Sequence, residues 1–188
     1  NFMAGAEMSR ASTAASQDTP IEGFSQCHAG IFRKLDQLGE LPALLAPAVR
    51  AREIAEKSLE FFREAIFEHH LDEERELFPA VVAHAEKGAE FDKVQFMVAR
   101  LTIEHRDLEA VWKRLESGLK AVAKGRDSDI NVADIELLVT RYRGHAQYEE
   151  TEFLPLAQTI LSRNSNHMAA LGMSLHMRHA PLQVVPFV

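Results

Sequence analysis

One phrase occurs twice in this sequence, first at residues 69–79 and again at residues 145–155. In each copy a histidine is followed four residues later by a glutamate, Glu73 or Glu149, and six residues after that glutamate comes a proline. Residues four apart lie one turn apart on the same face of an α-helix. The phrase therefore predicts two helices that each present an imidazole and a carboxylate to the same volume.

A lone histidine lies on an apolar helical stripe upstream of each copy, His28 before the first and His105 before the second. Mixed imidazole and carboxylate ligation suits iron, manganese or zinc. Buried ionisable groups are costly unless they are neutralised, and metal coordination is a common way to neutralise them. The sequence therefore predicts a site for two metals; the alternative is a polar core held by hydrogen bonds alone. The predicted ligands are His28, His69, Glu73, His105, His145 and Glu149.

The first copy allows a second frame, because His70 and Glu74 are also four residues apart. Ala146 stands where His70 would map in the second copy, so only the His69 frame is common to both halves. His69 also continues an apolar stripe, whereas His70 shares its face with charged residues. We therefore expect His70 to flank the site and keep it as a weaker candidate ligand.

Four further side chains lie close to the predicted ligands along the helices. Glu109 follows His105 by four residues and is a weaker candidate ligand, although a solvated position on the helix flank is the expectation. Glu74 and Glu150, next to the paired glutamates, are expected on a solvated face. Tyr142, one turn before His145, is expected in the core, with a hydrogen bond into the site as the alternative.

Apolar residues spaced three and four apart predict long amphipathic helices, which is typical of an all-α protein. The expected helices cover residues 20–38, 49 to the mid-80s, 89–124 and 132–161, and Gly39 to Pro47 is expected to be a connection because it contains two prolines. Four such segments predict an up-down-up-down four-helix bundle over residues 20–162. Residues 1–19 are expected to form a disordered arm, and residues 163–188 a short fifth helix with an extended tail.

Each copy of the phrase ends on a proline, Pro79 or Pro155, that lies inside a helical pattern. An internal proline lacks the N–H donor and clashes with the carbonyl four residues earlier. We therefore expect a kink or local opening near Arg75 and Thr151, directly after the glutamates of the repeated phrase.

The charge of the chain and its single cysteine exclude several classes of function. The net charge of −7 without a basic run disfavours binding to nucleic acid or to an anionic membrane. Cys27 is the only cysteine, so neither an intramolecular disulfide nor a cysteine-based zinc site is expected. No apolar stretch is long enough for a transmembrane helix and no secretory signal is evident, so we expect a cytoplasmic protein.

With its two phrases HHLDEERELFP and HAQYEETEFLP, the sequence resembles the hemerythrin-like, HHE cation-binding domain family over residues 20–162. The resemblance implies a four-helix bundle that holds two non-haem iron ions joined by an oxo or hydroxo group, with Glu73 and Glu149 bridging them. Respiratory hemerythrins have a second histidine on the third helix, where this chain has Glu109. The ligand set is therefore closer to that of bacterial hemerythrin-like proteins and iron–sulfur cluster repair proteins. Ferritin-like sites are disfavoured because they place glutamate before histidine at a spacing of three.

The expected function is reversible binding or sensing of a small diatomic, O2 or NO, at a di-iron site. One alternative is a di-iron oxidoreductase that reduces NO or peroxide, repairs iron–sulfur clusters or delivers iron, with a redox partner. Another is a structural metal protein that holds zinc or manganese.

Overall fold

The fold was analysed in a computed structural model that describes residues 19–163, 166 and 171–172. Every regular element in this described part of the chain is helical, which confirms the all-α class. The predicted N-terminal arm and the predicted fifth helix with its tail lie almost wholly outside the described residues. None of the described helices is long and apolar enough to cross a membrane.

The first helix, α1 (Pro20–Phe61), is longer than predicted. The connection expected between Gly39 and Pro47 is wrong, because these residues are helical and both prolines lie inside α1. Leucine and alanine, which favour helix, surround the two prolines in this stretch. The helix propensity of these residues outweighs the loss of the backbone hydrogen bonds that the two prolines cannot donate.

The chain divides into two compact units, one ending at Pro47 and the other beginning at Ala48. The described part of the first unit is the N-terminal part of α1. Its large apolar side chains are exposed, with relative exposures between 48% and 78% for Ile21, Phe24, Ile31, Phe32, Leu35, Leu38, Leu41, Leu44 and Leu45.

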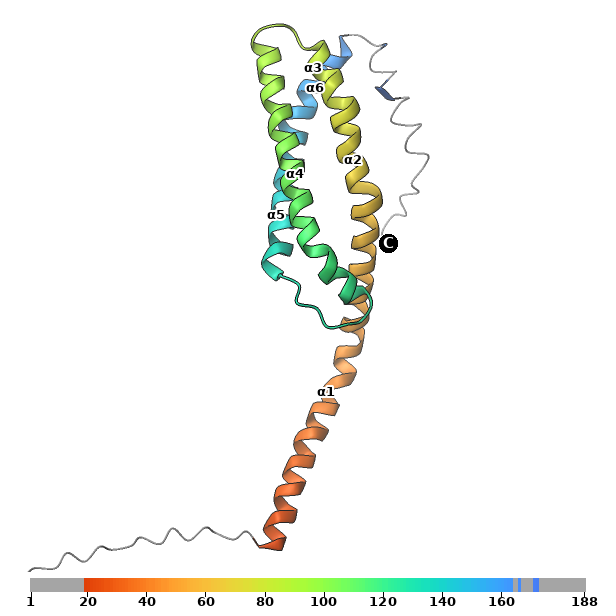
Figure 1. Cartoon of the computed structure of the whole chain (residues 1–188), viewed down its shortest axis with the longest axis vertical. Coiled ribbons are helices and arrows are strands. Elements are labelled where there is room, and N and C mark those ends of the chain that lie inside the picture. The colour runs from red at the N-terminus through yellow and green to blue at the C-terminus, as the bar shows by residue number, and fades with distance from the viewer. Residues whose placement is uncertain (1–18, 164–165, 167–170, 173–188) are drawn as a thin grey trace, which may run out of the picture. The chain divides into compact units, whose positions relative to one another are not determined.

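The described part of the second unit contains three long helical stretches that pack side by side (Figure 1). The first contains the end of α1, then the π-helical segment η1 (Phe62–Ile66), α2 (Phe67–Asp72), η2 (Glu73–Leu77) and α3 (Phe78–His84). The second is α4 (Ala89–Ala123), and the third contains α5 (Val132–Tyr148), η3 (Glu149–Phe153) and α6 (Leu154–Ser162). The predicted helices 89–124 and 132–161 are therefore confirmed to within a few residues.

The two reversals between these stretches use backbone conformations that glycine favours. Gly88 precedes α4 with a φ of 106°, and Gly125 follows α4 with a φ of 67°. Both values lie in the left-handed region, which side chains rarely enter. Asn131 then caps α5, because its side-chain oxygen accepts hydrogen bonds from the backbone N–H groups of Ala133 and Asp134.

Two clusters of buried apolar residues form the core of the second unit. One contains Phe78, Leu101 and Phe153, and the other contains Leu108 and Trp112. The ring of Trp112 stacks on Phe62 with a centroid distance of 4.0 Å and an interplanar angle of 3°. On α4 the buried His105 lies four residues after Leu101 and three before Leu108, so polar groups are held between the two apolar clusters.

Candidate metal centre

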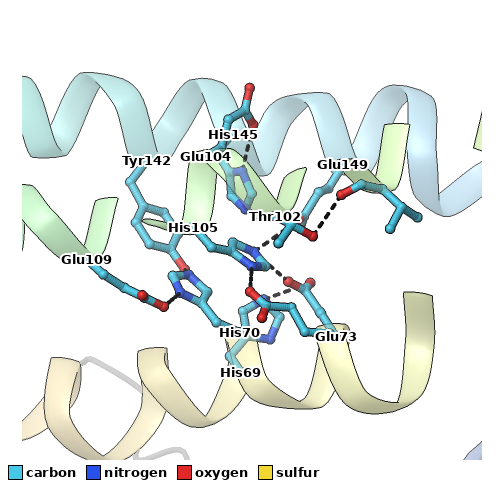
Figure 2. Close-up of polar contacts among 12 residues, drawn as sticks. His69, His70, Glu73, Thr102, Glu104, His105, Glu109, Tyr142, His145 and Glu149 are labelled. Atoms are coloured by element: carbon cyan, nitrogen blue, oxygen red, sulfur yellow. Dashed lines mark hydrogen bonds and ion pairs between the residues drawn. The ribbon is translucent and has the colours of Figure 1, made fainter. Parts of the chain in front are cut away.

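Five of the six predicted ligands gather between the three helical stretches of the second unit (Figure 2). One ligand atom from each of Glu73, His105, His145 and Glu149 lies within 4.8 Å of the others, and all four residues are buried. His69 joins them through its Nε2 atom, which is 3.1 Å from Oε1 of Glu73. The two copies of the phrase therefore face one another, as their spacing predicts.

The carboxylate of each phrase lies between imidazoles. The Nε2 atom of His105 is 3.0 Å from Oε2 of Glu73 and 4.0 Å from Oε1 of Glu149. The Nε2 atom of His145 is 2.9 Å from the same Glu149 oxygen. Glu73 thus faces His69 and His105, and Glu149 faces His145 and His105.

Four of these atoms are fully buried and have no hydrogen bond: Oε2 of Glu73, Oε1 of Glu149, and Nε2 of His105 and His145. A buried polar atom without a partner is expensive, and native structures contain few of them. Here the unsatisfied atoms all converge on one volume and are all atoms that bind divalent or trivalent metals. The donor set therefore fits a metal centre.

Two carboxylates outside this cluster orient the buried imidazoles. The Nδ1 atom of His105 is 2.7 Å from Oε1 of Glu74, and the Nδ1 atom of His145 is 2.8 Å from Oε2 of Glu104. A carboxylate at Nδ1 favours the proton on that nitrogen, which leaves Nε2 available as a ligand. The prediction that Glu74 lies on a solvated face is wrong, whereas its counterpart Glu150 is exposed.

Arginines hold the two orienting carboxylates. Arg106 pairs with Glu74 and also with Glu109, at 2.8 Å from Oε2 of Glu109. Arg100 donates to Glu104 at 2.9 Å. Sequence spacing did not single out Glu104, because its link to His145 depends on how α4 and α5 pack.

His70 is buried beside the cluster, but both of its ring nitrogens have other partners. Nδ1 is 3.1 Å from Oε1 of Glu109, and Nε2 is 3.1 Å from the hydroxyl of Tyr142. Its ring stacks on His105 at a centroid distance of 3.9 Å. Glu109 and Tyr142 therefore contact His70 in this structure. One ring nitrogen each of His70, His105 and His145 also lies within 4.8 Å of the others, so His70 stays a candidate ligand.

The charges of the site shift several pKa values. Burial raises the pKa of Glu73, but the adjacent imidazoles of His105 and His69 outweigh this effect and hold that pKa at about 2. Burial lowers the pKa of His70 to about 4, and repulsion from His105 adds to this effect. Burial also lowers the pKa of His145, yet the adjacent carboxylates of Glu149 and Glu104 leave it raised overall.

Each repeated glutamate begins a π-helical segment, η2 at Glu73 and η3 at Glu149. Arg75 and Thr151 lie inside these segments, so the predicted local opening before each proline is confirmed. A π-helical turn inserted into an α-helix is frequent at functional sites. In this chain both segments start at a residue of the buried cluster.

One side of the cluster is open. The side chain of His69 is 55% exposed, whereas that of His105 is fully buried. A cavity of about 350 Å³ lies beside His69 and Glu73 and is also lined by Leu77, Ala146 and Leu154. Small molecules therefore have access to the cluster from the His69 side.

His28 lies in the first unit, on an exposed part of α1. The structure does not place it with the other five residues, and its role as a ligand stays a prediction.

The sequence pattern of the hemerythrin HHE cation binding domain matches residues 19–157 of this chain. The chain belongs to this hemerythrin HHE family. The match confirms the resemblance that the two HxxxE phrases indicated, and it includes the segment of α1 that carries His28. A curated relative, an uncharacterized protein of Haemophilus influenzae, is 29% identical over 163 residues that cover 83% of this chain and 91% of the relative. No solved structure matches the chain.

Proposed function

We propose that this protein is a non-haem di-iron protein that binds a small diatomic, O2 or NO, as a sensor or scavenger. The observation that carries the proposal is the set of four buried, unsatisfied ligand atoms contributed by two HxxxE pairs and His105. Family membership supports cation binding in general. Imidazole and carboxylate donors without cysteine in the described cluster suit iron, manganese or zinc, and the choice of iron rests on the resemblance to hemerythrin-like proteins.

The residues that would hold the metals are His28, His69, Glu73, His105, His145 and Glu149, and the two glutamates would supply the carboxylate donors. Iron bound there would supply redox chemistry and an open coordination position for the diatomic. The chain's own residues have three tasks. Glu74 and Glu104 orient imidazoles, the apolar clusters on either side exclude water, and the cavity beside His69 admits the small molecule.

The experiment that tests this proposal combines metal analysis with optical spectroscopy on the full chain. We expect about two iron ions per chain after purification without added metal, and a spectrum that changes when O2 or NO is added to the reduced protein. A Glu149→Gln variant should lose both properties. The matched control is Glu150→Gln, because Glu150 is the adjacent residue and is exposed.

Each other outcome identifies a different function. Stoichiometric zinc or manganese with no spectral response to O2 or NO would show a structural metal site. Multiple turnovers of NO or peroxide with an added reductant would show an oxidoreductase. Protein that purifies and reconstitutes without any metal would overturn the proposal.

A further inference from the structure

The outer face of α4 carries two large apolar side chains that are exposed to solvent. Phe96 is 69% exposed and Ile103 is 63% exposed. They are seven residues apart and therefore lie on the same side of the helix, together with the exposed Ala99 and Ala110. The residues that α4 contributes to the two core clusters lie on its other side. Small residues beside large apolar ones allow a second helix to pack closely against this face.

Charged side chains of alternating sign lie along the same face. In chain order they are Asp92, Arg100, Asp107 and Arg114, and all four are exposed. Neither aspartate forms an ion pair among the described residues. Each arginine binds one carboxylate of its own chain, yet their side chains are still 46% and 52% exposed. A guanidinium group has several N–H donors, so both arginines can bind a further carboxylate.

The order of the apolar residues is self-complementary about Ile103. Phe96 and Ala110 are equally far from Ile103 along the chain, on opposite sides of it. If a second α4 lies antiparallel with its own Ile103 opposite this one, Phe96 of each copy faces Ala110 of the other. A large side chain then meets a small one at both ends of the apolar stretch, which favours close packing.

The order of the charges is self-complementary in the same alignment. Asp92 and Arg114 are equally far from Ile103, so each aspartate lies opposite the arginine of the other copy. Arg100 and Asp107 come opposite each other to within one residue. Opposite charges therefore meet along the whole pair of helices. A parallel alignment in the same register would instead bring like charges together, so the charge order selects the antiparallel one.

We propose that two copies of this chain form a symmetric dimer through the outer face of α4, with the two helices antiparallel. A twofold interface uses the same patch of both copies, as a self-complementary face requires. The stretch from Asp92 to Arg114 is about 33 Å long, because an α-helix rises about 1.5 Å per residue. One pair of helices of that length is a small interface, so the dimer should be weak and dependent on protein concentration. The face contains none of the proposed metal ligands, so the dimer does not depend on the proposed function.

A charge-reversal experiment on the full chain tests the alignment. Asp92→Arg and Arg114→Asp each put like charges opposite one another in a homodimer, so each variant alone should raise the dissociation constant by about tenfold or more. In an equimolar mixture the two reversed positions face each other and the two unchanged positions face each other. A heterodimer should therefore form with nearly the wild-type constant, measured by sedimentation equilibrium. A mixture that associates as weakly as the single variants, or single variants that associate as tightly as the wild type, would overturn the alignment.

The apolar contact is tested by Ile103→Glu, which places two carboxylates at the centre of the interface and should give a monomer at concentrations where the wild type is a dimer. The matched control is Val139→Glu, because Val139 is an apolar residue of α5 that is 49% exposed. A wild type that is monomeric at all concentrations overturns the dimer, as does an Ile103→Glu protein that stays dimeric. If a monomeric protein loses thermal stability with Ile103→Glu but not with Val139→Glu, another part of the same chain covers the face, and the dimer is again overturned.

Discussion

Nδ1 of His145 lies 2.8 Å from Oε2 of Glu104, a carboxylate that belongs to neither copy of the repeated phrase. Similarly, Nδ1 of His105 lies 2.7 Å from Oε1 of Glu74, which is part of the first copy. Each pairing directs the other ring nitrogen, Nε2, toward the buried glutamates. The orientation of the imidazoles is therefore set by residues on a neighbouring helix.

We predict that removing either orienting carboxylate weakens metal binding. Glu104→Ala or Glu74→Ala should lower metal affinity by about 10- to 100-fold, because the imidazole loses the partner that fixes its tautomer. Competition with a chelator of known affinity measures the effect. Glu150→Ala is the control, and equal affinities for all three variants would contradict the orienting role.

The paired glutamates should matter more than Glu109. Glu73→Ala or Glu149→Ala should remove most of the bound metal, because each carboxylate faces two imidazoles of the cluster. Glu109→Ala should retain most of it, since Glu109 contacts His70 and Arg106 instead. Elemental analysis of the purified variants gives the comparison. Complete metal loss in Glu109→Ala would reverse this ranking.

Metal removal should destabilise the protein strongly. The buried atoms that lack hydrogen bonds would stay unsatisfied, and a ligand that binds only the folded state stabilises it by about 3 kcal/mol at a hundredfold excess over its dissociation constant. One kcal/mol shifts the melting midpoint of a domain of this size by roughly 2–4 °C. We therefore expect Tm to fall by about 10 °C on chelation, measured by circular dichroism with metal loss confirmed separately. An unchanged Tm would mean that the polar cluster is stable without metal.

The metal-free protein should lose stability as the pH falls below about 6.5. His70 has a folded-state pKa of about 4 against an ordinary value of 6.5, so between these values the unfolded chain binds a proton that the folded chain does not. The free energy of unfolding then decreases toward acid, by on the order of 3 kcal/mol across the whole window.

Other groups of the site titrate outside this window. The raised pKa values of His69 and His145 stabilise the fold below 6.5, and this contribution is lost as the pH rises through their folded-state values. The lowered pKa of Glu73 changes the free energy of unfolding only below about pH 4.5. Urea unfolding at several pH values measures the dependence, and His70→Gln should flatten it. A His70→Gln protein with the wild-type slope would assign the effect to another group.

Sequence spacing predicted the parts of this protein that depend on helical periodicity. It located α4, placed His69 with Glu73 and His145 with Glu149, and indicated the opening at Arg75 and Thr151. These features follow from residues a few positions apart on one helix. Periodicity is sufficient to find such relationships.

Features that depend on competing propensities or on helix packing were not predictable in this way. The two prolines before Ala48 suggested a turn, but the leucines and alanines around them keep the backbone helical. Glu74 and His105 are 31 positions apart in the sequence, so no local spacing links them. The ligand role of His28 stays a prediction.

Trp112 is the only tryptophan of the chain, and its ring lies flat against Phe62. Its fluorescence therefore comes from one known position, where α4 meets a π-helical segment of the first stretch. Any event that separates these helices, including denaturation or rearrangement near the cluster, changes the surroundings of this single fluorophore. The protein thus contains an intrinsic optical reporter, and stopped-flow experiments on it need no attached dye.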